Sequence, residues 1–394
     1  MPEPKPHPGR LLIVRTDRIG DVVLSLPTVT ALRRAFPRAH LAALVQPSVQ
    51  EVVACQPDLD SILLDGPLER GWRGFFRLVI RLRRERFDAA VLLHPTWRLA
   101  LALRLSGIRI RAGTAYRAYS FLFNRQVREH RKVSQKHESE YNLSLARAVG
   151  ADARRVEFRL NVPNTAAAAV RSFLNGTPIG FRRPLVVLHP GSRGSALDWP
   201  PTRFADLADR LAEAGVPVVL TGGENEIDAV DRIVRQSASK PVSAAGRFDL
   251  KGLCALLKRA DLLVSNSTGP LHLAHALGTE VVGFYPPLTP AHPRRWGPYG
   301  RMDSVLMPGR PECRTCRRRR CPDWNCMDRI SVDGAWAMVS GKLKGLGYPI
   351  RSRHPASERD GTKDRVSRSG SRVSKRKPLS KARGSRQVTE RTAG

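Results

Sequence analysis

Two carboxylates stand near the start of the chain, at a position where substrates are commonly bound. The stretch "LLIVRTDRIGDVVLSLP", residues 11–27, begins as a buried strand and then presents Asp17 and Asp21 where a helix should start. In α/β proteins the turn after a first parallel strand usually holds substrate, and a carboxylate there can take a proton from an attacking hydroxyl group. An acid is also favourable in the first turn of a helix, so the residues leave Asp21 either role.

A second polar stretch, "VSNSTGPLHLAHALG" at residues 264–278, ends an apolar strand and opens a helix. Serine or threonine followed closely by proline is a strong signal for a helix start. A helix N-terminus beside Ser267, Thr268 and Gly269 offers free backbone N–H groups to a phosphate, and His272 lies on the same first turn. In the alternative interpretation, a hydroxyl simply caps the helix and His272 is an ordinary histidine of the surface or core.

Two further polar loops follow strands. In "LHPGSRGSALDWP", residues 188–200, Ser192 and Arg193 lie between glycines in a flexible loop that could wrap a diphosphate. The loop matches neither the Walker pattern nor the dinucleotide-binding fingerprint. In "TGGENE", residues 221–226, Glu226 or Glu224 could bind a ribose hydroxyl, or both could be solvated acids at the start of a helix.

Four of the six cysteines are bunched in "CRTCRRRRCPDWNC", with the pattern C-x2-C-x4-C-x4-C. Four thiolates could enclose a structural zinc, although the second pair lacks the short spacing of a zinc ribbon. Reduced or partly disulfide-bonded structural cysteines are the alternative. The residues concerned are Cys313, Cys316, Cys321 and Cys326.

The elements that must position these residues alternate along the chain. Apolar residues recur at helical spacing after Gly20, which gives strand, turn and helix. Alternating helices and continuously apolar strands predict parallel sheets covered on both faces, here as two doubly wound halves that meet between residues 160 and 184. Ligands of such sheets bind at the carboxyl ends of the strands. Further strands are expected at residues 40–45, 61–66, 88–95, 108–113, 184–192, 216–223, 240–246, 261–267 and 279–287.

The composition indicates anionic partners. The 394 residues include 67 Lys and Arg against 35 Asp and Glu, a formal net charge of +32, which suits phosphorylated small molecules, nucleic acid or an acidic membrane surface. Residues 351–394 hold 14 Lys and Arg, 4 Asp and Glu and almost no large apolar residue. We therefore expect a disordered tail that serves solubility or binds an acidic surface. No apolar run is long enough for a signal peptide or a membrane span, so we expect a cytoplasmic protein.

Taken together, the stretches resemble one family. "RTDRIGDVVLSLP", "HPGSRGSALDWPPTRFADLADRL", "TGG.NE" and "NSTGPLHLAHALG", in this order and spacing, are similar to glycosyltransferase family 9, the lipopolysaccharide heptosyltransferases. The resemblance covers residues 10–348. It implies a GT-B type α/β fold with two Rossmann-like doubly wound domains facing a central cleft. We place an acceptor-side domain at residues 10–165, a nucleotide-sugar-binding domain at residues 180–348, and the disordered basic tail at residues 351–394.

The resemblance also implies a reaction. A sugar, most simply a heptose, would pass with inversion from a nucleotide-diphosphate donor of the ADP-heptose type to a lipopolysaccharide core or a related lipid-linked acceptor, with no catalytic metal or other cofactor. Asp21 matches the family's general base in the acceptor-side domain. The donor-binding residues would be Ser192, Arg193, Glu226, Ser267, Thr268, Gly269 and His272, several of which could stabilise the charge on the departing diphosphate.

Two positions depart from the family pattern. Leu197 stands where heptosyltransferases commonly have lysine, and Ser267 stands where many have aspartate. The missing lysine removes a cation beside the diphosphate, which Arg193 could replace. These changes bear on the identity of the donor sugar more than on the fold.

One stretch suggests a membrane surface. "GWRGFFRLVIRLRRERF", residues 71–87, combines large apolar side chains with six arginines. A basic amphipathic helix of this kind can lie on an anionic bilayer, which would place the enzyme peripherally at the inner face of the cytoplasmic membrane. The alternative is that its apolar stripe only covers the sheet.

Parts of the sequence are also compatible with two other classes of protein. The net charge of +32 and the basic tail suggest a nucleic-acid-binding protein, but the sequence has no RNP, zinc-finger or helix-turn-helix pattern. RNA binding that survived removal of the tail would favour that class. Leu197 and Ser267 suggest a third class, a family member that binds a nucleotide sugar and has lost catalysis.

Overall fold

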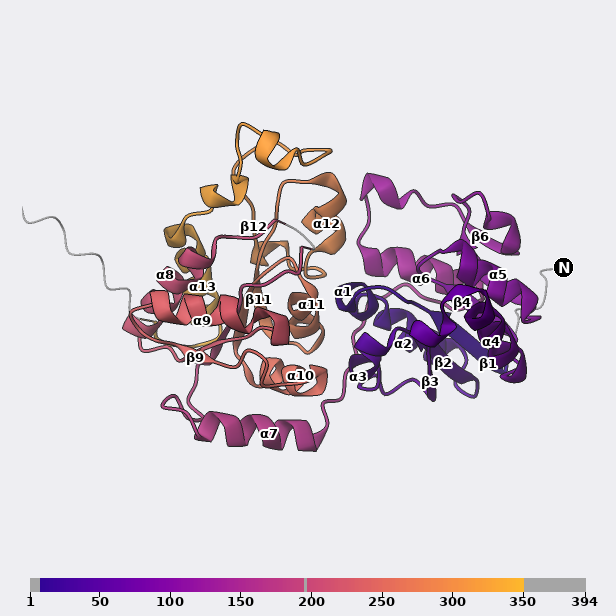
Figure 1. The fold of residues 1–394 in the computed structure, drawn as a ribbon, viewed down its shortest axis with the longest axis horizontal. Helices are drawn as coiled ribbons and strands as arrows, with labels where there is room; N and C mark the ends of the chain where they lie inside the picture. Colours follow the sequence, from indigo (N-terminus) through magenta and orange to yellow (C-terminus); the bar gives the residue numbers. More distant parts are fainter. Residues whose placement is uncertain (1–7, 195–196, 351–394) are drawn as a thin grey trace, which may run out of the picture. The chain divides into compact units, whose positions relative to one another are not determined.

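The computed structural model describes residues 8–194 and 197–350. The tail at residues 351–394, for which disorder was expected, lies outside the described residues. Two parallel sheets of six strands each form the frame of the protein (Figure 1). The first sheet has the order β3-β2-β1-β4-β5-β6, and the second has the order β12-β11-β10-β7-β8-β9. Read from β9 to β12, the second order is the same as the first, with β7 in the place of β1 and β12 in the place of β6. This is the strand order of a Rossmann fold, so the expected α/β class with two doubly wound halves is confirmed.

The strands lie close to the ranges expected from the apolar runs. In the first sheet they are β1 (Arg10–Val14), β2 (His40–Val45), β3 (Ser61–Leu64), β4 (Ala89–Leu92), β5 (Ile110–Thr114) and β6 (Arg125–Val127). In the second they are β7 (Val186–His189), β8 (Val218–Leu220), β9 (Val242–Ser243), β10 (Leu262–Asn266), β11 (Glu280–Phe284) and β12 (Val305–Leu306). The edge strands β6 and β12 were not expected, because they are short and contain no buried apolar run.

Helices cover both faces of each sheet, because alternate residues of the central strands point to opposite sides. On β1, Leu11 and Ile13 pack under α2 and α6, whereas Leu12 and Val14 pack under α4 and α5. The helices of the first half are α1 (Ile19–Val23), α2 (Leu26–Ala35), α3 (Gln50–Val53), α4 (Gly71–Arg84), α5 (Trp97–Leu105) and α6 (Glu138–Ala148).

The second half is built in the same way. On β7, Val186 and Leu188 pack with α8, α9 and α13, and Val187 packs with α7, α10 and α11. The helices are α7 (Asn164–Asn175), α8 (Pro201–Glu213), α9 (Ile227–Gln236), α10 (Leu250–Arg259), α11 (Gly269–Ala276), α12 (Pro293–Trp296) and α13 (Val332–Gly345). Within the described residues, no helix has the length and apolarity that crossing a membrane requires.

The prediction of a single helix after Gly20 is wrong, because the structure has two helices there, α1 and α2, separated at Leu24 and Ser25. Pro27 explains the break, because it has no backbone N–H to continue the helical hydrogen bonds. The carbonyl of Leu24, left free at the break, accepts hydrogen bonds from Ser139 Oγ at 2.8 Å and Asn142 Nδ2 at 3.3 Å. The break therefore ties the loop after β1 to α6.

Candidate functional site

The predicted site residues follow strands at the two points where the strand order reverses. In the first sheet this point lies between β1 and β4, and in the second between β7 and β10. Side chains that follow adjacent parallel strands meet in a crevice at the carboxyl edge of the sheet. Asp21 comes after β1, Ser192 after β7, and Ser267 after β10.

Arg15, the first residue after β1, organises the loop that carries Asp21. Its side chain is buried, and its NH2 donates to Asp21 Oδ1 at 2.7 Å while its Nε donates to Asp17 Oδ1 at 2.8 Å. Its NH1 donates to Glu138 Oε1 at 3.1 Å. Because one guanidinium binds three carboxylates, the two aspartates of the loop are held in fixed orientations.

Asp21 is the third residue of α1 and does not cap it: the N-cap position is Arg18, and the carboxylate turns to Arg15 instead. Its side chain is 23% exposed. Burial raises the pKa of Asp21 to about 6, with Arg15 opposing the rise and the carboxylates of Asp17 and Glu138 adding to it. A carboxyl group with a pKa just below neutrality is ionised at pH 7 yet basic enough to accept a proton.

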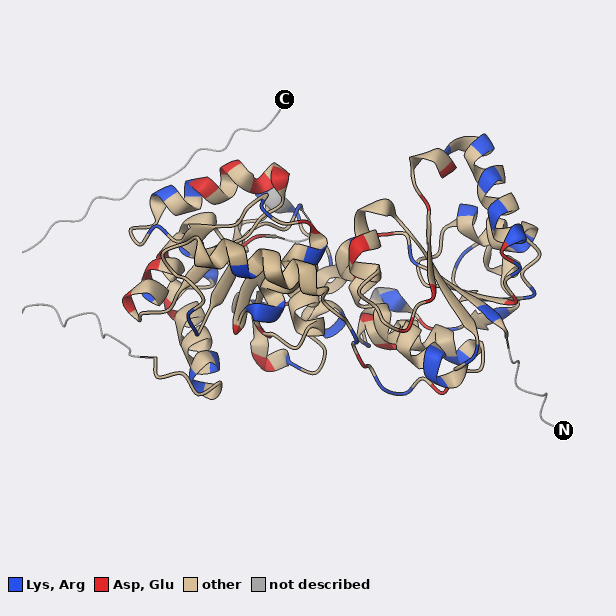
Figure 2. Cartoon of the chain, turned by 90° about the horizontal axis from the view of Figure 1, so that it is seen from below, with Lys and Arg blue, Asp and Glu red and all other residues tan. Residues whose placement is uncertain are grey.

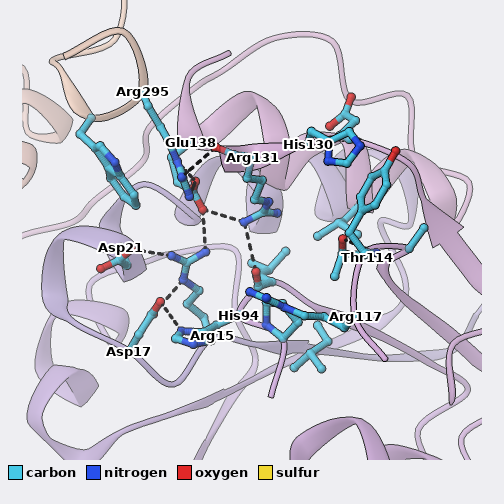
Figure 3. A pocket seen from close by; sticks show the side chains of 18 of the residues that line it. Arg15, Asp17, Asp21, His94, Thr114, Arg117, His130, Arg131, Glu138 and Arg295 are labelled. Atoms are coloured by element: carbon cyan, nitrogen blue, oxygen red, sulfur yellow. Dashed lines mark hydrogen bonds and ion pairs between the residues drawn. The ribbon is translucent and has the colours of Figure 1, made fainter. Parts of the chain in front are cut away.

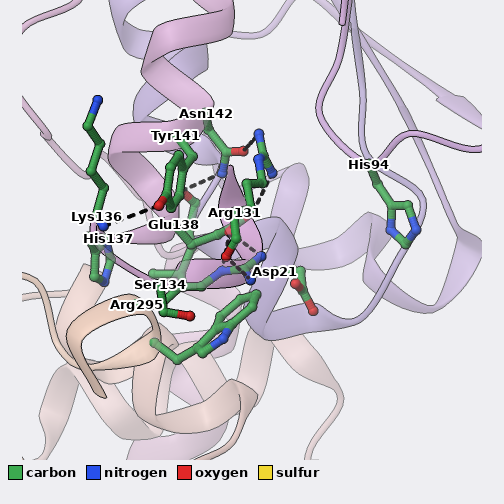
Figure 4. A network of polar contacts seen from close by, with 12 residues as sticks. Asp21, His94, Arg131, Ser134, Lys136, His137, Glu138, Tyr141, Asn142 and Arg295 are labelled. Carbon is green, nitrogen blue, oxygen red and sulfur yellow. Dashed lines mark hydrogen bonds and ion pairs between the residues drawn. The ribbon is translucent and has the colours of Figure 1, made fainter. Parts of the chain in front are cut away.

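Glu138 is the buried centre of a cationic network (Figure 4). Arg131 NH1 approaches its Oε1 at 2.7 Å and Arg295 NH2 approaches its Oε2 at 2.8 Å, in addition to the contact from Arg15. Burial alone would raise the pKa of Glu138, but the three guanidinium groups hold it at about 2. A capping box between His137 and Glu140 starts α6 at this residue, which fixes Glu138 at the edge of the site.

These charges line a cavity of about 800 Å³ at the carboxyl edge of the first sheet (Figure 3). Its wall is strongly cationic, because Arg117, Arg131 and Arg295 line it together with Arg15. His94, which follows β4, bonds through its Nδ1 to Asp17 Oδ2 at 2.6 Å. The cavity can therefore hold an anionic, hydroxyl-bearing molecule next to Asp21.

The two halves contact each other where α1 meets α11. A Cβ on Gly20 would lie 2.9 Å from His272 Cδ2 and 3.4 Å from Gly269 Cα, and a Cβ on Gly269 would lie 2.1 Å from Ile19 Cγ2. Only glycines allow this contact. It brings the loop of Asp21 to the N-terminus of α11.

A second cavity, of about 640 Å³, opens beside this contact and is lined from both halves. It collects seven of the eight predicted site residues, which are Asp21, Ser192, Arg193, Ser267, Thr268, Gly269 and His272. The expected central cleft is thus present between the two doubly wound halves.

The N-terminus of α11 is suited to an anion. Thr268 occupies the N-cap position but its side chain makes no capping hydrogen bond, so the first backbone N–H groups of the helix have no side-chain acceptor. His272 is buried, and its Nδ1 has no hydrogen-bond partner among the described residues. Burial, with smaller effects of His137 and His275, lowers the pKa of His272 to about 3, so the imidazole is neutral at pH 7.

Glu226 lies outside that cavity, in an adjoining one of about 660 Å³. Its Oε2 accepts a hydrogen bond from the backbone N of Gly223 at 2.8 Å, which begins the following helical turn. A Cβ on Gly191 would lie 2.0 Å from Glu226 Oε1. Glu226 therefore joins the two loops after β7 and β8, and Arg193 and Thr268 line both cavities.

Several residues of the site were not predicted. Arg15 stands in the motif that follows β1 but was not singled out, because its buried partner Glu138 lies 123 residues away. No motif marks Glu138, Arg131 or Arg295. His189 is buried in the adjoining cavity, where burial lowers its pKa to about 4 and its Nδ1 lies 3.0 Å from Thr221 Oγ1. Its position at the end of an apolar strand was the one available signal.

The cysteine cluster does not support the structural zinc. Among the described residues, Cys313, Cys316, Cys321 and Cys326 form no disulfide bond. In residues 8–194 and 197–350, no three Cys, His, Asp or Glu side chains are placed to hold a metal ion. Leu197, at the position where heptosyltransferases commonly have lysine, packs against the apolar core.

Two parallel α/β sheets with a shared strand order and a cavity between their carboxyl edges are the architecture of GT-B glycosyltransferases. A family model for glycosyltransferase family 9 (heptosyltransferase) matches residues 75–326. The chain belongs to glycosyltransferase family 9.

Similar proteins span nearly the same length. A putative glycosyltransferase of Haemophilus influenzae is 27% identical over 347 residues, covering 86% of this chain and 97% of its own. The lipopolysaccharide core heptosyltransferase OpsX of the same species is 24% identical, with the same coverages. Among solved structures, ADP-heptose LPS heptosyltransferase II of Escherichia coli matches with a TM-score of 0.69 at 18% identity, covering 86% of this chain and all of that one.

Proposed function

We propose that this glycosyltransferase moves a heptose, with inversion, from ADP-heptose to the saccharide core of a lipopolysaccharide precursor. The observation that carries the proposal is the cavity of about 640 Å³, which is lined by Asp21 from the first half and by Thr268, Gly269 and His272 from the second. A base and an anion-binding helix N-terminus around one cavity are what an inverting transfer needs. The relatives named as ADP-heptose and lipopolysaccharide core heptosyltransferases support this choice of donor and acceptor.

The acceptor would lie in the arginine-lined cavity of the first half, with its nucleophilic hydroxyl at Asp21. Arg131 and Arg295 suit the acidic groups of a lipopolysaccharide core. As the oxygen attacks the anomeric carbon, its proton passes to the Asp21 carboxylate. Arg15 keeps that carboxylate oriented, and the cationic network around Glu138 keeps Arg15 in place.

The donor diphosphate would lie at the N-terminus of α11. Negative charge grows on the diphosphate as the bond from the anomeric carbon to its oxygen breaks. The free N–H groups of α11 stabilise that charge, and His272 Nδ1, for which the described part of the chain offers no partner, can donate a hydrogen bond to it. Arg193 takes the place of the lysine that Leu197 replaces, because it lines both the main and the adjoining cavity.

The test is a comparison of turnover and nucleotide affinity. Asp21→Asn should lower kcat by a factor of about 100 or more, the scale for a general base, and leave ADP affinity within about threefold of the wild type. Asp228→Asn is a matched control, because Asp228 is also an acid in the first turn of a helix and is exposed. Wild-type turnover by Asp21→Asn would remove Asp21 from the mechanism.

Calorimetry with ADP, UDP, GDP and CDP tests the donor. ADP should bind most tightly, and His272→Gln should weaken its binding by about tenfold, the loss of one charge-assisted hydrogen bond. Tight ADP binding by a wild-type protein that shows no turnover with ADP-heptose and lipopolysaccharide acceptors would indicate a family member that has lost catalysis. We also propose that the protein works peripherally at the inner face of the cytoplasmic membrane, where a lipid-linked acceptor would be found.

A further inference from the structure

Helix α4 (Gly71–Arg84) has two apolar faces, although the sheet covers only one. Leu78, Val79 and Leu82 are buried against the first sheet, which accounts for the inner face. Trp72, Phe76 and Ile80 recur every fourth residue on a different side of the helix and are 74%, 48% and 51% exposed. A surface helix normally carries polar residues there, so covering the sheet does not explain these three side chains.

The exposed aromatic side chains on this side of α4 pack against one another. The rings of Trp72 and Phe76 pack edge to face with centroids 5.8 Å apart, and Phe75 packs on Phe76 at 5.5 Å. Leu68, in the turn just before the helix, is 72% exposed. Because the rings support one another, they stay outward as a cluster. Strips of exposed apolar groups rimmed by charge mark interaction surfaces.

The charge around this strip is entirely positive along α4. Arg73, Arg83 and Arg84 are exposed, and in the described part of the chain their side chains make no ion pair. By helical spacing all three lie on the same side as the exposed rings. Figure 2 shows the arginines as a series of blue bands along this helix, at the upper right. The surface combines unpaired cations with apolar side chains that have no cover.

We propose that this surface docks on an anionic lipid bilayer. We call it the α4 ridge and define it by Leu68, Trp72, Phe76, Ile80, Arg73, Arg83 and Arg84. Apolar side chains would enter the boundary of the acyl chains, and the guanidinium groups would contact lipid phosphates. Charge decides against a second copy of this chain as the occupant, because two α4 ridges would bring arginines against arginines.

The ridge begins beside the proposed acceptor side of the enzyme. Arg70, two residues before Trp72, lines a further cavity of about 450 Å³ together with Thr16 and Gln46, which follow β1 and β2. A saccharide anchored in the same bilayer would therefore reach the carboxyl edge of the first sheet. This last step rests on the proposed function, whereas the ridge itself is argued from exposure and charge alone.

Vesicle flotation of the full-length chain tests the ridge. Wild type should bind vesicles of phosphatidylcholine and phosphatidylglycerol (3:1) and bind pure phosphatidylcholine at least tenfold more weakly. The variant Trp72→Ser/Phe76→Ser/Ile80→Ser keeps every charge, including the basic tail, and should lose at least tenfold in binding to the anionic vesicles. Arg73→Gln/Arg83→Gln/Arg84→Gln should also bind them more weakly and show a smaller dependence on salt.

The matched control replaces exposed apolar residues of the second half, Phe181, Met302 and Leu346, with serine; these are 46%, 50% and 46% exposed. It should bind vesicles as the wild type does. Unfolding midpoints verify that each variant is folded. If the serine variant of the ridge floats like the wild type, another surface carries the binding and the proposal is wrong.

Two further readouts separate the alternatives. Sedimentation velocity without lipid shows whether the wild type forms a dimer through the α4 ridge. A dimer that the serine variant of the ridge dissociates, together with unchanged flotation of that variant, would reject the bilayer as the occupant in favour of a second copy of the chain. ADP affinity should be equal in the wild type and the ridge variant. Failure of the wild type to bind ADP would defeat the proposed donor but leave the flotation result standing.

Discussion

Arg15 and Glu138 lie 123 residues apart in the sequence, yet Arg15 NH1 donates to Glu138 Oε1 across 3.1 Å, and both side chains are buried. The same guanidinium holds Asp21 at 2.7 Å. The start of α6 therefore sets the orientation of a carboxylate on a different element. In the proposed mechanism Glu138 is a positioning residue, since it acts on the reacting atoms through Arg15.

Glu138→Gln should destabilise the protein by about 3–5 kcal/mol at pH 7, because it leaves the buried Arg15 and the half-buried Arg131 and Arg295 without their shared carboxylate. The direction in which this stabilisation changes with pH follows from the pKa of Glu138, which is about 2 and lies below the ordinary value of 4.5. The stabilisation is fully present above about pH 4.5 and is lost as pH falls toward 2. Unfolding curves of the wild type and the variant should therefore converge in acid. A constant gap between pH 7 and pH 3 would contradict the buried network.

The pH dependence of turnover should report Asp21. Its pKa is raised to about 6 by burial, and a general base must be ionised. kcat/KM should therefore rise tenfold per pH unit below about pH 6 and level off above it. His94→Gln is the control, because His94 lines the same cavity and contacts Asp17. The acid limb should persist in His94→Gln, and its disappearance there would contradict the assignment of the limb to Asp21.

Asp21→Asn should also make the protein more stable. A raised pKa means that the folded state resists ionising Asp21, so this residue costs stability once the pH exceeds its ordinary pKa of 3.8, and the cost is complete above about 6. Asparagine is neutral at every pH, so Asp21→Asn should raise the free energy of unfolding by about 1–3 kcal/mol at pH 7.5. Thermal unfolding at pH 4 and at pH 7.5 measures the difference. The gain should nearly vanish at pH 4, and a gain of equal size at both values would point to a cause other than ionisation.

The fold was largely predictable because each central strand is a continuous apolar run. Those strands are buried on both faces, so the sequence between Leu11 and Val14 could not belong to an exposed edge. The edge strands β6 and β12 lack that signal. The break between α1 and α2 could have been predicted from Pro27, which interrupts the hydrogen bonding of an otherwise helical pattern.

The site was predictable only where its chemistry is local. Asp21 and the residues at the start of α11 each follow a strand within a few positions, so strand ends and helix starts locate them. Arg15 directly follows β1, but its role could not be found in this way, because its partner Glu138 is fixed by the packing of α6 on the sheet. Glu226 shows the opposite limit: its side chain contacts the backbone N of Gly223, three residues earlier, and sequence alone could not separate this local contact from ligand binding.

The close approach of α1 and α11 gives the last prediction. Gly20→Ala adds a methyl group that would lie 2.9 Å from His272 Cδ2 and 3.4 Å from Gly269 Cα, so one helix must move. A shift of a few tenths of an ångström to 1 Å between a base and the rest of a site can cost up to about 100-fold in rate. We expect kcat to fall about 10–100-fold. ADP affinity should change by less than about threefold, because the proposed diphosphate contacts belong to α11 itself.

Gly341→Ala is the matched control, since a Cβ on Gly341, within α13, meets nothing within 4 Å. Alanine is favourable in a helix, so this variant should keep wild-type turnover and unfold at an equal or higher temperature. Steady-state kinetics and ADP calorimetry on both variants separate the two effects. Wild-type kcat in Gly20→Ala would mean that turnover does not depend on the contact between α1 and α11. A loss of ADP affinity equal to the loss of kcat would mean that the methyl group disturbs the nucleotide site and leaves the alignment of the base unaffected.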